Sequence, residues 1–231
     1  MLLLFDIDGT LLVKAADEHR DAMLEALRVV HGVTDPVRTQ FKVAGRTDLE
    51  IARGILVNSG VSAERIDARA DDVRIAAGEA YARLVPDDLS HTVPPGIREL
   101  LEELHANEDT LLALVTGNFE AIARMKLRSA GLGEFFPSRQ GAFGSDHEDR
   151  TMLPAIARRR AGDGNGGPWP RARTVVIGDT PRDIACARAD RVRVVAVTTG
   201  PYTRDELKAA DAVAHNAHEL GDVLRKLLAA L

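Results

Sequence analysis

The chain has 231 residues, a formal net charge of −5 at pH 7 and a sequence pI near 5.8. This length fits one core domain with a smaller domain inserted into it. Nucleic-acid-binding domains normally carry a basic surface, so the acidic balance argues against a nucleic-acid partner. The apolar content of 45% and the charged content of 28% are ordinary for a globular protein with a buried core.

Cysteine usage and the N-terminus bear on location. Cys186 is the only cysteine, so no intramolecular disulfide can form, and we expect it to pack inside an alanine-rich helix. The N-terminal apolar run is interrupted by Asp6, which predicts a strand rather than a secretory signal. No stretch approaches the ~20 apolar residues of a membrane span. These features favour a cytoplasmic protein with no membrane partner.

Short apolar runs alternate with helical patterns along most of the chain. A continuous apolar run bounded by helices predicts a parallel strand that is covered on both faces. The fold class is therefore α/β, with a three-layer, Rossmann-like parallel sheet. Such strands are expected at 2–5, 111–115, 174–178 and 192–197. The run FGS at 143–145 could end a further strand, and 212–214 is a candidate for a short one.

Residues 14–91 differ from the rest, because they show helical patterns and no convincing strand. Gly32 and Gly60 follow two of these patterns, at positions where glycine typically ends a helix. The pattern predicts an all-helical domain at 14–91, inserted directly after the first strand. The core domain would then comprise residues 1–13 and 92–231.

The segment AGDGNGGPWPRAR at 161–173 is rich in glycine and proline, which predicts a loop. It precedes the strand at 174–178, so we expect it, Trp169 included, at the N-terminal edge of the sheet. Ligands of open α/β sheets bind at the carboxyl edge. This loop is therefore expected to lie away from the chemistry.

Acidic residues follow two of the predicted strands. Asp6 and Asp8 come directly after the first strand, and GDTPRD places Asp179 and Asp183 after the strand at 174–178. Buried carboxylates are costly unless a cation lies beside them, and carboxylate oxygens suit Mg²⁺. The sequence therefore predicts a divalent-metal site at the carboxyl edge of the sheet. Taken alone, Asp183 could instead be a first-turn acid that complements the dipole of its helix.

A third strand, at 111–115, runs into TGNFE. Thr116 offers a hydroxyl, and Gly117 and Asn118 offer backbone amides where the next helix begins. Helix N-termini attract anions, phosphate above all. One edge of the sheet would thus carry acids, a metal and an anion site, which suits transfer of a phosphoryl group to a carboxylate.

Three segments resemble motifs of the haloacid dehalogenase-like (HAD) hydrolase superfamily. They are LLLFDIDGT, LLALVTGN and TVVIGDTPRD, and they occur in the family's order. The predicted helical insert is similar to the family's C1-type cap, as in its phosphoglycolate phosphatase and β-phosphoglucomutase-like branch. The resemblance implies a Mg²⁺-dependent phosphatase that hydrolyses a small phosphorylated metabolite through an aspartyl-phosphate intermediate.

The resemblance also implies roles for the residues that match the motifs. Asp6 would be the nucleophile, and Asp8 the acid and base, whose backbone carbonyl also contacts Mg²⁺. Asp179 would ligate Mg²⁺, and Asp183 would support the metal shell. Thr116 would bind the transferring phosphoryl group.

The family's third motif, commonly a lysine before a proline, departs from the usual pattern here. Arg150 stands at that position in GSDHEDRTMLPAIARRRA. Arginine keeps the positive charge but differs from lysine in geometry. Lys126, on the helix after Thr116, is the alternative source of this cation. We favour Arg150, which could otherwise be a surface charge.

Within the predicted insert, AGRTDLEIA resembles the substrate-specificity loop of C1 caps. Closure of such a loop excludes water and completes a site. Arg46 or Thr47 is therefore expected to contact the substrate, and Arg46→Ala to raise KM more than it lowers turnover. A plain salt bridge is the other interpretation of Arg46.

Asp8 also bears on the subgroup, because family dehalogenases lack this second aspartate. Hydrolysis of a phosphate ester is therefore favoured over dehalogenation of a 2-haloacid. A phosphomutase of the β-phosphoglucomutase type would use the same residues. A catalytically silent binding protein is the remaining alternative, and the chain could be a monomer or a homodimer.

Overall fold

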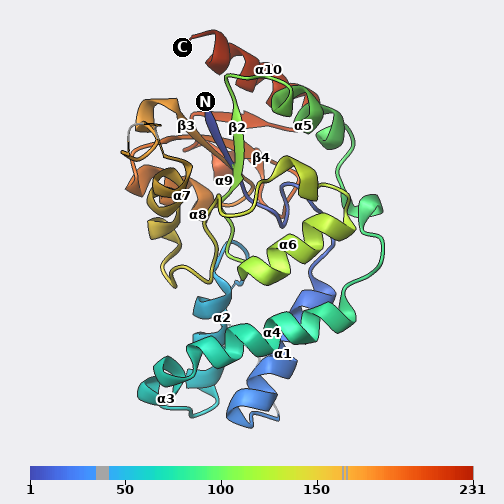
Figure 1. The fold of residues 1–231 in the computed structure, drawn as a ribbon, viewed down its shortest axis with the longest axis vertical. Helices are drawn as coiled ribbons and strands as arrows, with labels where there is room; N and C mark the ends of the chain where they lie inside the picture. The colour runs from blue at the N-terminus through green and yellow to red at the C-terminus, as the bar shows by residue number, and fades with distance from the viewer. Residues whose placement is uncertain (35–41, 163, 165, 231) are drawn as a thin grey trace.

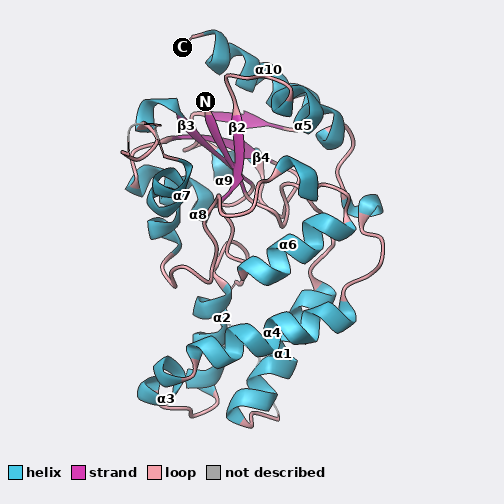
Figure 2. Ribbon diagram, in the orientation of Figure 1, coloured by secondary structure: helices cyan, strands magenta, loops and turns pink. Residues whose placement is uncertain are grey.

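The computed structural model describes residues 1–34, 42–162, 164 and 166–230. Its centre is a five-stranded parallel sheet with the strand order β2–β1–β3–β4–β5 (Figures 1 and 2). The α/β fold class is thereby confirmed. The strands are β1 (Leu2–Phe5), β2 (Leu111–Leu114), β3 (Thr174–Gly178), β4 (Arg193–Val197) and β5 (Ala212–Ala214).

The weaker strand predictions had different outcomes. The candidate at 212–214 is confirmed as β5. The candidate at 143–145 is wrong, because Ala142 makes a single parallel bridge with Val115 and the chain then turns. One bridged residue gives no ladder of hydrogen bonds, so the apolar residues there are buried without forming a strand.

The described residues between β1 and residue 90 form four α-helices, which we call the helical insert. They are α1 (Asp17–His31), α2 (Asp48–Asn58), α3 (Ala63–Ala68) and α4 (Ala70–Leu84). Figure 1 shows them together at one end of the molecule, away from the C-terminal helix. Gly32 ends α1 with a φ of 75°, as predicted. No strand occurs among the described residues of 14–91, whereas the exact domain limits stay a prediction.

The two faces of the sheet are covered by different helices. Side chains alternate along a strand. Leu3 and Phe5 of β1 therefore pack towards α5 (Ile97–His105) and α10 (Ala217–Ala229), while Leu2 and Leu4 pack towards α7 (Leu153–Ala161) and α8 (Pro181–Ala189). Cys186 is buried in the second of these clusters, which confirms its predicted packing role. The remaining described helices are α6 (Glu120–Ser129) and α9 (Arg204–Leu207), with 3₁₀ turns η1 (Ser90–Thr92), η2 (Gly133–Phe135), η3 (Arg150–Met152) and η4 (Arg171–Arg173).

Helix α6 joins the helical insert to the core. Phe119 and Ile122 belong to the same apolar cluster as Met23, Leu56 and Tyr81 of the insert. Burial of a side chain of this size contributes about 1.5–3 kcal/mol, so the shared cluster holds the insert against α6. Because α6 follows the carboxyl end of β2, the insert is brought to the edge of the sheet where the acidic residues lie.

The described residues of the loop before β3 lie at the opposite edge of the sheet, as predicted. Trp169 is partly buried against the cluster under α7 and α8, and its indole N–H donates to the carbonyl of Arg173 at 3.1 Å. Among the described helices, none is both long and apolar enough to cross a membrane.

Candidate active site

Three buried carboxylates meet at the carboxyl ends of β1 and β3. Asp6 follows β1, Asp179 follows β3, and Asp183 lies in the first turn of α8. The two strands are neighbours, with Phe5 paired to Ile177, so residues after their ends are adjacent. Each of the three acids offers one oxygen atom, and these oxygens lie within 4.8 Å of one another. The predicted convergence of the first and fourth motifs is therefore observed.

The guanidinium of Arg150 lies among these acids. Its Nη2 is 3.0 Å from Asp6 Oδ2 and 2.5 Å from Asp183 Oδ1. The side chain is buried, so the surface-charge interpretation of Arg150 is wrong. Its Nε has no hydrogen-bond partner in the described part of the chain. An unsatisfied buried donor of a charged group is costly, and it is the kind of group that an anionic ligand would satisfy.

Burial changes the ionisation of the acids in this cluster. It raises the pKa of Asp6 to about 6, against the opposing effect of Arg150. Burial, together with the charges of Asp6 and Asp183, raises the pKa of Asp179 to about 8. No ion pair of Asp179 occurs among the described residues, and its Oδ1 accepts a hydrogen bond from the Thr10 hydroxyl at 3.2 Å. Three clustered carboxylates, one without an ion pair, are a donor set that fits a divalent ion such as Mg²⁺.

Asp183 also stabilises the start of α8. Its Oδ2 accepts hydrogen bonds from the backbone N–H of Thr180 at 2.9 Å and from the Thr180 hydroxyl at 2.7 Å, which completes a capping box. The first-turn interpretation of Asp183 is thus correct but incomplete. The same carboxylate also holds Arg150, so it links the helix start to the cation of the site.

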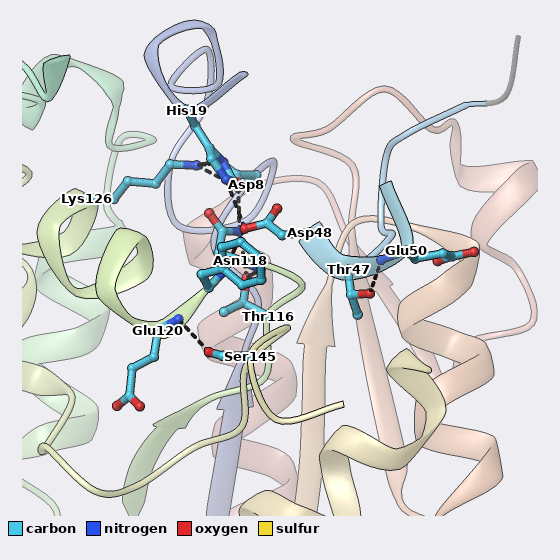
Figure 3. Close-up of polar contacts among 11 residues, drawn as sticks. Asp8, His19, Thr47, Asp48, Glu50, Thr116, Asn118, Glu120, Lys126 and Ser145 are labelled. Atoms are coloured by element: carbon cyan, nitrogen blue, oxygen red, sulfur yellow. Dashed lines mark hydrogen bonds and ion pairs between the residues drawn. The ribbon is translucent and has the colours of Figure 1, made fainter. Parts of the chain in front are cut away.

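Asp8 faces a second cation, as Figure 3 shows. Lys126 on α6 is fully buried, and its Nζ lies 2.7 and 2.9 Å from the two carboxylate oxygens of Asp8. Asn118 Nδ2 donates to Asp8 Oδ2 at 2.8 Å. Burial opposes ionisation, but the Lys126 ammonium and these hydrogen bonds hold the pKa of Asp8 below its ordinary value. The two candidate cations therefore serve different acids, Arg150 beside Asp6 and Lys126 beside Asp8.

His19 of α1 connects Lys126 to Asp48 of α2 (Figure 3). The Lys126 Nζ is 3.1 Å from His19 Nδ1, and His19 Nε2 is 3.0 Å from Asp48 Oδ2. An ammonium group can only donate, so Nδ1 accepts and the ring proton lies on Nε2, which donates to Asp48. Sequence reasoning missed His19 and Asp48. The two residues are 29 positions apart, and no local pattern relates them.

The N-terminus of α6 is occupied by the carboxylate of Asp48. Its Oδ2 accepts a hydrogen bond from the N–H of Phe119 at 2.7 Å, and its own N–H donates to the Gly117 carbonyl at 2.8 Å. The next amide, that of Glu120, donates to Ser145 Oγ at 2.9 Å. A helix N-terminus does hold an anion here, as its dipole favours. That anion comes from the insert, and the amides of Phe119 and Glu120 are already hydrogen-bonded. A phosphate at this helix end can therefore bind only to groups that precede Phe119.

Thr116 and Asn118 lie directly beside Asp8. The buried Thr116 hydroxyl accepts from Asn118 Nδ2 at 2.9 Å and from the Asn118 backbone N–H at 3.3 Å. Gly117 lies between them against the insert, where a Cβ would stand 2.0 Å from the carbonyl oxygen of Arg46. The structure thus joins Thr116 to Asp8 through the side-chain amide of Asn118, with Gly117 between Thr116 and Asn118 in the chain.

The two expected substrate contacts of the insert have protein partners in this structure. The Thr47 hydroxyl caps α2 by accepting from the Glu50 N–H at 3.1 Å, and it donates to the Glu148 carbonyl at 2.6 Å. Arg46 donates to the Lys42 carbonyl at 3.0 Å and forms an ion pair with Glu50. The salt-bridge interpretation of Arg46 is therefore correct. A substrate contact by Arg46 or Thr47 stays a prediction.

Comparisons with known proteins agree with this architecture. A family model described as "haloacid dehalogenase-like hydrolase" matches residues 3–188. The "Probable phosphatase IndB" of Dickeya dadantii is 30% identical over 211 residues, covering 91% of this chain and 86% of that protein. A "Phosphoglycolate phosphatase" of Rhodospirillum rubrum is 30% identical over 218 residues, covering 92% and 85%. The chain belongs to the haloacid dehalogenase-like hydrolase family.

A solved structure shares the fold. The "beta-Phosphoglucomutase (pgmB)" of Clostridium difficile superposes with a TM-score of 0.66 at 18% identity, covering 99% of this chain and 97% of that one. At this level of identity the likeness concerns the fold alone. Function must therefore be argued from the site.

Proposed function

We propose that the protein is a Mg²⁺-dependent phosphatase, which hydrolyses a small phosphate monoester through an aspartyl-phosphate on Asp6. The observation that carries this proposal is the convergence of Asp6, Asp179 and Arg150 at one sheet edge. Asp8 and Thr116 follow the ends of the paired strands β1 and β2 at the same edge and are joined through Asn118. The names of the two relatives, a phosphatase and a phosphoglycolate phosphatase, support a small phosphorylated metabolite as the substrate.

In the first step, Asp6 attacks phosphorus while the bond between phosphorus and the leaving oxygen breaks. Arg150 and the Thr116 hydroxyl bind the non-bridging oxygens. Arg150 is suited to this role because its Nε–H has no hydrogen-bond partner among the described residues. Asp8 donates a proton to the departing oxygen. In the free protein Lys126 keeps Asp8 ionised, so Asp8 takes up its proton when the negative phosphate group lies beside it.

In the second step, Asp8 accepts a proton from a water molecule whose oxygen attacks phosphorus. The bond between Asp6 and phosphorus then breaks, which restores the carboxylate and releases inorganic phosphate. Asp6, Asp179 and the backbone carbonyl of Asp8 would hold Mg²⁺, with Asp183 in support. When bound, the ion offsets the repulsion between the Asp6 carboxylate and the phosphate.

The other candidate reactions make different products. A phosphomutase would return the phosphoryl group to the substrate through a bisphosphorylated intermediate, and a dehalogenase would release halide from a 2-haloacid. Asp8 argues against the dehalogenase, since attack on carbon leaves no alkoxide that needs a proton. A silent binding protein would have no reason to keep Asp6, Asp8, Arg150 and Asp179 together.

The test is release of inorganic phosphate from p-nitrophenyl phosphate and from a panel of phosphorylated metabolites. We expect activity with Mg²⁺, loss of activity in EDTA, and recovery when Mg²⁺ is restored in excess. Asp6→Asn should abolish turnover, whereas Asp17→Asn, at an exposed acid of α1, should leave it unchanged. A folded wild-type protein that releases phosphate equally well in EDTA would refute the metal-dependent mechanism. A bisphosphorylated intermediate would indicate the mutase.

A further inference from the structure

The loop that follows β4, residues 198–203, contacts the acidic cluster although it lies outside all of the motifs. The Thr199 hydroxyl donates to the carbonyl of Gly9 at 2.5 Å, which ties this loop to the first-motif turn. Gly200 comes next and lies directly against the carboxylate of Asp179. The loop therefore reaches both strands that deliver the expected metal ligands.

The space around Asp179 is defined by two glycines. A Cβ at Gly200 would lie 1.7 Å from Asp179 Oδ2, and a Cβ at Gly9 would lie 2.2 Å from the same oxygen. Both distances are far below any real contact between a carbon and an oxygen atom. Asp179 Oδ1, the other oxygen, is held by the Thr10 hydroxyl at 3.2 Å. The carboxylate thus lies in a slot whose two walls carry no side chain.

Backbone conformation does not explain the glycine at position 200. Gly9 has a φ of +86°, a region that favours glycine for conformational reasons. The φ of Gly200 lies outside the left-handed region, so an alanine could adopt its backbone conformation. What excludes a side chain at this position is the Asp179 carboxylate.

We propose that Gly200 is a positioning residue of the metal site, because the absence of its side chain determines where the Asp179 carboxylate lies. The hydrogen bond from Thr199 to Gly9 holds the backbone of Gly200 in place. The inference rests on the proposed function, because it assigns Asp179 to a divalent ion. Any side chain at position 200 would displace the Asp179 carboxylate from its present position in the acidic cluster and so weaken binding of the ion. Gly200 itself has no side chain that could take part in the reaction.

The experiment measures metal binding directly rather than through turnover. Mn²⁺ is titrated into the wild-type protein and into Gly200→Ala, and free Mn²⁺ is followed by electron paramagnetic resonance. We expect the dissociation constant to rise at least tenfold in Gly200→Ala. The matched control is Gly133→Ala, because φ at Gly133 is also not left-handed and a Cβ there would meet its nearest neighbour at an ordinary 3.5 Å. This control should bind Mn²⁺ like the wild type.

The result that would overturn the inference is an unchanged dissociation constant in a Gly200→Ala protein with native circular dichroism. If Gly200→Ala does not fold, Thr199→Val decides, because it removes the hydrogen bond to Gly9 without adding a clash. We expect Thr199→Val to raise the dissociation constant about threefold, and no change would refute the role of the loop. Wild-type protein that binds Mn²⁺ but lacks phosphatase activity would count against the proposed function and leave the Gly200 comparison intact.

Discussion

In the proposed mechanism, Asp8 must meet two requirements that oppose each other. As an acid it must carry a proton, yet Lys126 and Asn118 both donate to it and favour its ionised form. As the base of the second step it must be ionised, which is the state that these donors stabilise. The arrangement therefore favours attack by water, while protonation of the leaving group depends on the charge of the bound phosphate.

This division predicts different behaviour of Asp8→Asn towards two kinds of ester. p-Nitrophenolate leaves without a proton, so the first step should survive and phosphorylated Asp6 should accumulate. We expect a burst of about one nitrophenolate per protein, followed by turnover slowed by about 10²–10⁴-fold. Alkyl phosphates, whose leaving groups need the proton, should show no burst. The measurement is rapid-quench or stopped-flow kinetics.

Asp6→Asn is the control for this experiment, since it has no nucleophile and should give no burst with either ester. A burst of equal size with alkyl and aryl esters in Asp8→Asn would mean that Asp8 is not the acid. Absence of any burst, with slow steady turnover of both esters, would place Asp8 in metal binding instead.

At the scale of elements, α2 is docked on the core by its first turn. Asp48 accepts from the N–H of Phe119 and from His19 Nε2, and Thr47 donates to the carbonyl of Glu148. A second contact is the ion pair between Arg53 and Glu148, 2.7 Å long. The first turn of one helix in the insert thus reaches both the second-motif loop and the loop before Arg150.

We expect Asp48→Asn to loosen this docking without changing the shape of the side chain. The substitution removes the negative charge from the N-terminus of α6. It also places an amide group opposite His19, either its nitrogen, which donates, or its oxygen, which accepts more weakly than a carboxylate oxygen. The free energy of unfolding should fall by about 1–2 kcal/mol, and kcat/KM should fall by about tenfold because less of the protein is in the docked form. Chemical denaturation and steady-state kinetics measure the two effects.

Asp67→Asn is the comparison for Asp48→Asn, because Asp67 also lies in the insert but pairs with Arg53 at an exposed position. It should change stability by no more than about 1 kcal/mol and leave kcat/KM unaltered. If Asp48→Asn loses stability but keeps the wild-type kcat/KM, docking of α2 does not limit catalysis.

The elements that the sequence predicts well are those whose pattern is local. The strand at 2–5 and the acids after it follow from a run of apolar residues that ends in Asp6, and the same holds for 174–178 and Asp179. The predicted strand at 143–145 is wrong because Phe143 is buried outside a strand. In the sequence, such a residue looks the same as a buried strand residue. Contacts such as Lys126 with His19 depend on how the insert packs on α6, which no run of residues encodes. The space that requires Gly200 is likewise visible only in three dimensions.

For the whole molecule, metal binding should be linked to stability and to pH. A ligand present at 100 times its dissociation constant stabilises a protein by about 2.7 kcal/mol. For a chain of this length that corresponds to a rise of about 5–10 °C in Tm. In the metal-free protein the pKa of Asp179 is about 8, so below pH 8 Asp179 holds a proton that the ion must displace. The rise in Tm at one fixed Mg²⁺ concentration should therefore be larger at pH 8.5 than at pH 6.

Differential scanning calorimetry with Mg²⁺ or EDTA at both pH values measures this linkage. Asp179→Asn has no titrating group at this position and one ligand fewer, so its Tm should respond little to Mg²⁺ at either pH. A rise in Tm for the wild type that is the same at pH 6 and pH 8.5 would contradict the proton displacement.

The central position of β1 has a consequence for how the protein is made. Leu2 pairs with Leu111 on one side and with Thr174 on the other, so β1 is synthesised before both of its neighbours and must wait for them. The helices of the insert form local contacts in the meantime, whereas pairing between distant strands is slow and leaves apolar surface open to aggregation. A nascent chain that ends before β3 would carry Asp6, the proposed nucleophile, but not Asp179. Activity can therefore arise only late in synthesis, after the third strand has joined the sheet.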